Sequence, residues 1–198
     1  MAERERRVMT LPVEGRAAES GERRLSGYAA LYGVETTIGG FFREVIEPGA
    51  FRAALGRKDD VRALFNHDPN LILGRVASGT VTLSDDERGL RYDIDLPDTQ
   101  FGRDLWTLVQ RGDVSQSSFA FSVDAEEWRD LREPLALRVV KDVTLFDVSA
   151  VTYPAYSETT VAARSTAASF KAATEWQASL ATRQAELMTA NVWRRGRC

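Results

Sequence analysis

Cysteine and histidine are the scarcest reactive residues in this chain of 198 residues. The only cysteine is Cys198, so the sequence offers neither an internal disulfide nor a cysteine-rich metal site. A reducing, cytoplasmic setting is therefore expected. The only histidine is His67, which leaves one imidazole as a candidate general base.

Long apolar runs and an excess of basic charge are also absent. No stretch approaches the roughly 18 apolar residues of a membrane-spanning helix, and no apolar segment of signal-peptide length follows the charged residues 1–7. The net charge of −3 and the pI near 5.4 argue against a protein that binds nucleic acid through its phosphates. We expect no membrane span, no export signal and no nucleic-acid partner.

The patterning that is present predicts an α+β fold. A hydrophobic content of 43% is enough for one sizeable core. Two segments, 48–55 and 99–111, have helical spacing, with Asp98 as the expected cap of the second and Gly56 as the stop of the first. We expect a mostly antiparallel, barrel-like core with these helices at its periphery. The expected strands are 8–13 at an edge, 25–32, 41–46, 61–67, 71–76, 79–83, 90–96, 117–123, 135–140 and 143–151, with a turn at 68–70.

The composition changes after residue 164. Residues 165–198 are rich in alanine, serine and threonine, and their apolar side chains roughly follow a helical stripe. We therefore expect one domain over residues 1–164, followed by a linker and a helical tail over 165–198. The stripe does not decide whether the tail packs on the core or on a partner.

The strand 117–123 contains the best candidate nucleophile. Side chains of a strand point alternately to opposite faces, so Ser117 should share a core face with Phe119 and Phe121. Ser118 should lie on the opposite face, where small side chains leave room for a peptide and an imidazole. A serine needs such a base to act as a nucleophile. Spacing alone also allows Ser118 to be an ordinary strand hydroxyl.

His67 and Asp147 complete a candidate catalytic set. His67 ends a predicted strand, from which its ring could reach a cleft, although it could equally be a simple turn residue. Asp147 interrupts an apolar strand, where an unpaired carboxylate would be costly. It could orient His67 and leave the other ring nitrogen free for the proton of Ser118. A salt bridge with a basic residue would also account for it.

Several separated blocks occur in a recognisable order over about residues 8–164. They are Leu25–Tyr32, Glu47–Phe51, Phe65–Asp68 followed by Leu73-Gly74, Gly89-Leu90, Gly112–Ser115 with Ser118–Phe121, and Leu145–Tyr156. Together they resemble the prohead (capsid maturation) serine proteases of tailed bacteriophages, which are similar in fold to the herpesvirus assemblins. By this resemblance the catalytic histidine falls on His67, the nucleophile on Ser118 and the acidic residue on Asp147. Family members commonly have Glu at the last position, and Gly-Met where this chain has Gln116-Ser117.

The resemblance implies an activity and its partners. A member of this family would be a serine endopeptidase that cleaves scaffold and capsid-protein segments, and itself, inside the immature capsid in the host cytoplasm. The major capsid protein and scaffold segments would be its substrates, and no cofactor or metal is expected. A homodimer is expected by analogy with the assemblins.

Other classes of function stay open at this point. A non-enzymatic capsid-assembly or scaffold module would use the β-rich domain for docking and the tail as an anchor, and would not depend on His67. A metal hydrolase is disfavoured, because one histidine and scattered carboxylates give no ligand cluster at a known spacing.

Overall fold

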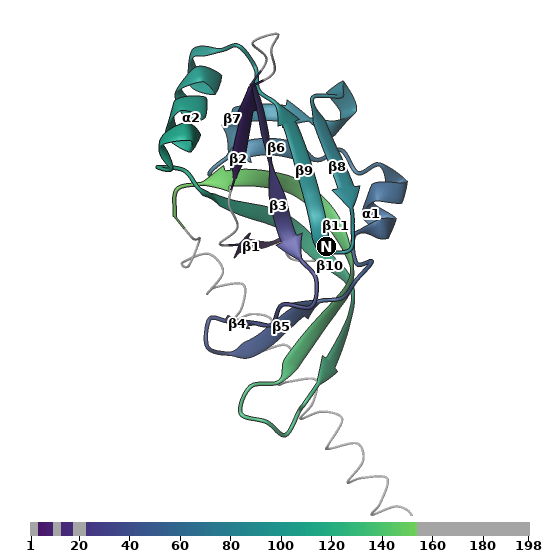
Figure 1. Ribbon diagram of the computed structural model, residues 1–198. Coiled ribbons are helices and arrows are strands. Elements are labelled where there is room, and N and C mark those ends of the chain that lie inside the picture. The colour runs from purple at the N-terminus through teal and green to yellow at the C-terminus, as the bar shows by residue number, and fades with distance from the viewer. Residues whose placement is uncertain (1–3, 10–12, 18–22, 154–198) are drawn as a thin grey trace, which may run out of the picture.

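The computed structural model describes residues 4–9, 13–17 and 23–153 (Figure 1). Within them the chain forms eleven strands, two α-helices and one 3₁₀ helix, which confirms the α+β class. The elements are β1 (Glu5–Met9), β2 (Glu14–Ala17), β3 (Arg23–Leu31), β4 (Thr36–Ile38), β5 (Phe42–Ile46), α1 (Arg52–Arg57), β6 (Arg62–Phe65), β7 (Asp68–Arg75), η1 (Val76–Ser78), β8 (Val81–Asp85), β9 (Gly89–Asp95), α2 (Gln100–Arg111), β10 (Gln116–Arg129) and β11 (Leu137–Val151).

The described strands form two sheets and no closed barrel, so the barrel-like expectation is corrected. One sheet has the order β1-β10-β11-β5-β4, with β6 paired to β11 and β7 to β6, and the other has the order β2-β3-β9-β8. Most pairings are antiparallel, as expected, but β5 and β6 run parallel to β11. The fifteen residues of β11 explain this arrangement. The strand is long enough to pair β5 along its first part and β6 along its last.

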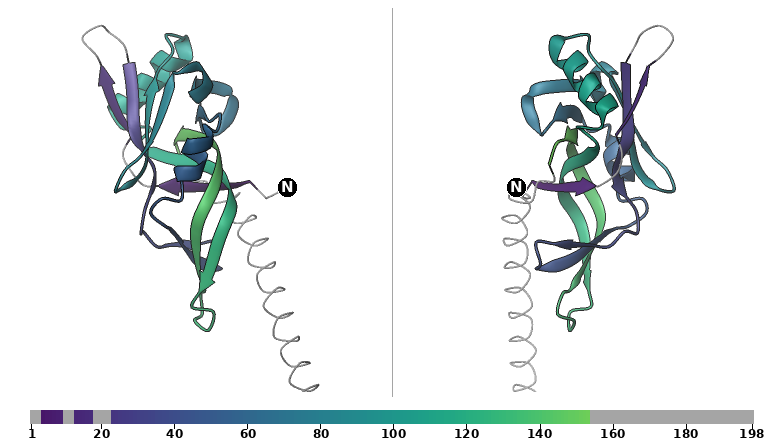
Figure 2. Two further views of the ribbon diagram at one scale, coloured as in Figure 1. Left: turned by 90° about the vertical axis from the view of Figure 1, so that its right-hand side faces the viewer. Right: turned by 60° about the vertical axis from the view of Figure 1, so that its left-hand side comes forward.

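The long hairpin of β10 and β11 runs through the fold and extends beyond it (Figures 1 and 2). Its inner part supplies the core, where Phe119 and Phe121 are fully buried and stack with ring centroids 4.7 Å apart. Phe51 packs edge-on against Phe119 at 5.9 Å. The alternation predicted for this strand therefore holds, and it leaves Ser118 on the face away from these rings.

The two helices differ from expectation at their ends. In α1, Gly56 lies inside the helix, and the left-handed residue that ends it is Lys58, with φ of 56°. In α2, the cap is Thr99, whose hydroxyl accepts a hydrogen bond from the backbone N–H of Gly102 at 3.1 Å. Asp98 pairs with Arg103 instead. No helix among the described residues is long and apolar enough to span a membrane.

The turn before β7 and the short strands differ from expectation, and the tail lies outside the described residues. The turn expected at 68–70 lies at Asn66 and His67 instead, because Asp68 already begins β7. The short strands β2 and β4 were not expected from the sequence. The predicted helical tail of 165–198 lies outside the described residues.

Candidate active site

The sheet brings Ser118, His67 and Asp147 together from three elements. Ser118 of β10 pairs across the ladder with Ser149 of β11, two residues beyond Asp147. Strand β6 lies on the other side of β11, and Arg62 is opposite Asp147. Because β6 runs parallel to β11, the residues that follow β6 come out beside the end of β11. The side chain of His67 starts from that position.

The turn that carries His67 has an unusual backbone. Asn66 and His67 both have left-handed conformations, with φ of 52° and 57°. The backbone N–H of Asn66 donates to the carbonyl of Ala150 at 3.0 Å, and its side-chain oxygen accepts from the backbone N–H of Thr152 at 3.0 Å. The end of β11 therefore fixes the backbone from which the imidazole projects.

The imidazole of His67 lies between the other two side chains. Its Nε2 is 2.6 Å from Oγ of Ser118, and its Nδ1 is 2.5 Å from Oδ1 of Asp147. A carboxylate at Nδ1 favours the tautomer with the proton on that nitrogen, which leaves Nε2 free to accept from the serine. Ser118 and Asp147 have no exposed surface, and His67 is 8% exposed. This is the arrangement of a serine nucleophile, a general base and an orienting acid.

The environment of Asp147 keeps it ionised. Burial raises the pKa of this carboxyl, but hydrogen bonding and charge interaction with His67, the Arg4 guanidinium and the Ser149 hydroxyl hold the pKa below its ordinary value. Arg4 pairs with Oδ2, and Ser149 donates to Oδ1 at 3.1 Å. Sequence reasoning assigned no role to Arg4 or Ser149. Strand alternation puts Ser149 on the face of Asp147, but no sequence signal places Arg4 there.

The neighbouring hydroxyl of Ser117 points elsewhere. It is fully buried and lies 2.7 Å from the Tyr92 hydroxyl. Burial raises the pKa of Tyr92 to about 12, although its hydrogen bond with Ser117 acts in the opposite direction. Ser118, and not Ser117, is the serine next to the imidazole.

Comparison with known families identifies the class of protein to which the chain belongs. The family model of the caudovirus prohead serine proteases matches residues 10–173. The chain belongs to that family. The protein is therefore a serine protease of capsid maturation, which acts inside the immature capsid, and the non-enzymatic module is set aside. Capsid proteins are the substrates that this family implies.

The protease is similar to the solved structure of the bacteriophage T4 capsid assembly protease, gp21, with 13% sequence identity and a TM-score of 0.47, covering 74% of this chain and 98% of that chain. No curated protein matches the protease.

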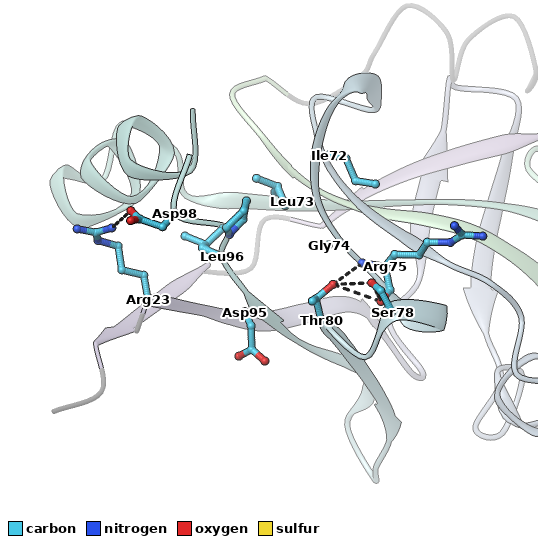
Figure 3. A pocket seen from close by; sticks show the side chains of 11 residues that line it. Arg23, Ile72, Leu73, Gly74, Arg75, Ser78, Thr80, Asp95, Leu96 and Asp98 are labelled. Carbon is cyan, nitrogen blue, oxygen red and sulfur yellow. Dashed lines mark hydrogen bonds and ion pairs between the residues drawn. The ribbon is translucent and has the colours of Figure 1, made fainter. Parts of the chain in front are cut away.

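A large cavity lies apart from the three residues. It has a volume of about 760 Å³ and lies between the second half of β7 and residues 95–98 (Figure 3). At one side Arg23 pairs with Asp98 at 3.5 Å, and at the other Thr80 accepts from the backbone N–H of Arg75 at 2.9 Å. Its lining includes none of the three candidate catalytic side chains, so it is a separate feature of the surface.

Proposed function

We propose that the protease cuts peptide bonds by transferring the acyl group of the substrate to Ser118 and then to water. The observation that carries this proposal is the imidazole of His67 within hydrogen-bonding distance of both Ser118 and Asp147. Oγ of Ser118 attacks the substrate carbonyl while Nε2 of His67 takes the hydroxyl proton. His67 then gives that proton to the leaving amine, and the same nitrogen activates the water that hydrolyses the acyl-enzyme.

Asp147 has an orienting and electrostatic role in this mechanism. It fixes the ring of His67 and stabilises the imidazolium that forms when Ser118 attacks. The lowered pKa of Asp147 supports this role, because the carboxylate must carry its charge at neutral pH. No cofactor is needed for any of these steps.

The natural substrates in this proposal are scaffold segments, segments of the major capsid protein, and the protease chain itself. Family membership supports this choice of substrates. Cleavage would take place inside the immature capsid in the host cytoplasm, with no nucleic-acid or membrane partner. A homodimer stays a hypothesis by analogy with the assemblins, and sedimentation of the purified protein would test it.

The division of the chain is also part of the proposal. Residues 1–164 would form the catalytic domain, and residues 165–198 a linker and helical tail. A chain truncated after residue 164 should still cut a soluble peptide substrate. Loss of that activity with the fold retained would place catalytic elements in the tail.

The decisive experiment uses purified protein and a capsid-protein or scaffold substrate. Ser118→Ala and His67→Ala should each lower kcat by at least about 10³-fold, with the circular dichroism spectrum unchanged. Ser117→Ala is the matched control, since its hydroxyl faces Tyr92, and it should keep most of the rate. Full activity in Ser118→Ala would refute the proposal, and loss only in Ser117→Ala would move the nucleophile by one position.

A further inference from the structure

Strand β1 covers the proposed nucleophile. It is an edge strand of its sheet and pairs antiparallel with β10, with Val8 directly opposite Ser118. Figure 2 shows β1 running alongside the inner part of β10. Because Ser118 has no exposed surface, a substrate carbonyl has no approach to its Oγ while β1 is in place.

Strand β1 also competes for the proton of Ser118. Oγ of Ser118 lies 2.9 Å from the backbone carbonyl of Arg7 and donates to it, while Nε2 of His67 lies 2.6 Å away. A serine hydroxyl has a single proton. When Arg7 accepts it, His67 does not, so the pair is not set for attack.

The residue before β1 acts on the third member of the set. The Arg4 guanidinium pairs with Oδ2 of Asp147 and lies over the Phe146 ring, 4.9 Å from its centroid. A cation at this carboxylate opposes the charge that would stabilise the imidazolium of His67. Residues 4–9 therefore cover the serine, accept its proton and offset the charge of the acid.

We infer that residues 4–9 are an internal cap, which occupies the position of a substrate strand and must leave before an extended peptide can bind. This inference rests on the proposed function of Ser118 and His67. An extended peptide can add to a free sheet edge through its main chain, and release of β1 would expose such an edge of β10 beside Ser118. Residues 4–9 also lie outside residues 10–173, which the family model matches.

The buried charges that hold β1 in place have partners that remain paired when β1 leaves. Glu5 and Arg7 form buried pairs with Arg138 and Glu44, respectively, and with each other. Burial raises the pKa of Glu5, but its hydrogen bonds and charge interactions with Arg138 and Arg7 bring the pKa below its ordinary value. If β1 leaves, Arg138 keeps Glu44 at 3.1 Å and Glu126 at 2.6 Å. Of its buried charges the departing strand takes Glu5 and Arg7, one of each sign, so no buried cation is left unpaired.

A reversible lock tests the cap directly. Arg6 and Ala120 are paired across β1 and β10, so Arg6→Cys with Ala120→Cys, made with Cys198→Ser, should form a disulfide that holds β1 in place. The oxidised protein should lose at least nine-tenths of its substrate cleavage and of its Ser118 labelling by a fluorophosphonate probe. Reduction should restore both. Equal rates in the oxidised and reduced protein would overturn the cap while leaving the proposed function intact.

Weakening the cap should have the opposite effect. The charge-neutral double substitution Glu5→Ala with Arg7→Ala should raise the labelling rate of Ser118 at least tenfold, equivalent to about 1.4 kcal/mol in the opening equilibrium. A synthetic peptide of residues 4–9 should lower that labelling rate again, because it would bind the vacated edge of β10. Labelling at the wild-type rate would count against the cap. The proposed function fails, and the cap with it, if no protein of the series cleaves substrate or is labelled at Ser118. The series is the wild type, the reduced double-cysteine variant and the Glu5→Ala, Arg7→Ala variant.

Discussion

Replacement of Asp147 by asparagine should reverse the tautomer of His67. Oδ2 of Asp147 faces the Arg4 guanidinium and Oδ1 faces Nδ1 of His67. A guanidinium only donates hydrogen bonds, so the amide of an Asp147→Asn variant should turn its oxygen to Arg4 and its NH₂ to His67. Nδ1 must then accept, which moves the ring proton to Nε2. That nitrogen can no longer take the proton of Ser118.

The expected loss is large because the base itself is blocked. In serine proteases the equivalent change lowers kcat by about 10⁴-fold through the wrong tautomer, which corresponds to about 5 kcal/mol. We expect a loss of this order in Asp147→Asn, measured as kcat on a peptide substrate. The melting temperature should be followed in parallel, to confirm that the variant is folded at the assay temperature.

Arg4 provides the refuting test, because it is the group that dictates how the amide is turned. In an Arg4→Ala background the amide can present its oxygen to His67, so nitrogen-15 NMR of the substrate-free protein should find the ring proton on Nδ1, whereas Asp147→Asn alone should carry it on Nε2. The comparison uses the substrate-free protein because residues 4–9 are then in place. The same tautomer in both variants would show that the tautomer argument is wrong.

Three further substitutions test the fold. Folding lowers the carboxyl pKa of Glu5 from 4.5, so Glu5 adds stability above pH 4.5 that is lost as the pH falls through its pKa in the folded protein. The Glu5→Gln variant should therefore lose less stability than wild type between about pH 6 and pH 3 in thermal unfolding. Parallel curves for the two proteins would contradict this. Phe119→Ala should cost about 3–5 kcal/mol in urea unfolding, because the ring is fully buried, and a loss under about 1 kcal/mol would contradict the packing. Gly89→Ala should lower the free energy of unfolding by about 2 kcal/mol or more in urea unfolding. An added Cβ would lie 2.1 Å from the Ala30 carbonyl oxygen, and φ of Gly89 is 152°. Unchanged stability would show that β3 and β9 can move apart at this pair.

The local parts of the fold were predictable from the sequence. Alternation along β10 puts Phe119 in the core and Ser118 on the other face, and the structure has both there. The end of α2 at Gly112 follows from the left-handed conformation that this residue adopts, with φ of 80°. Both features depend only on near neighbours in the chain, which is why periodicity and cap residues are enough to find them.

The non-local parts were not predictable. Strand patterns do not specify partners, so the parallel pairing of β5 and β6 with β11 was missed, and the expected barrel is replaced by two sheets. Pro69 suggested a turn, but the residue lies in β7. The pairing of β6 with β7 shifts register between Leu64 and Phe65, and Pro69 falls in the part of β7 that this shift leaves without a regular partner. The contact of Arg4 with Asp147 spans almost the whole described chain. The groups that bury the candidate active site could therefore be identified only from the structure.

The backbone of the Asn66–His67 turn has a consequence for how the protease reaches its reactive geometry. A non-glycine residue in the left-handed region raises the conformational free energy by about 1–3 kcal/mol. In this protein the folded sheet offsets that cost before any substrate binds. The imidazole is thus preorganised, and binding energy need not be used to aim it. Loosening the junction of this turn with Ala150 should slow the reaction well before the chain unfolds.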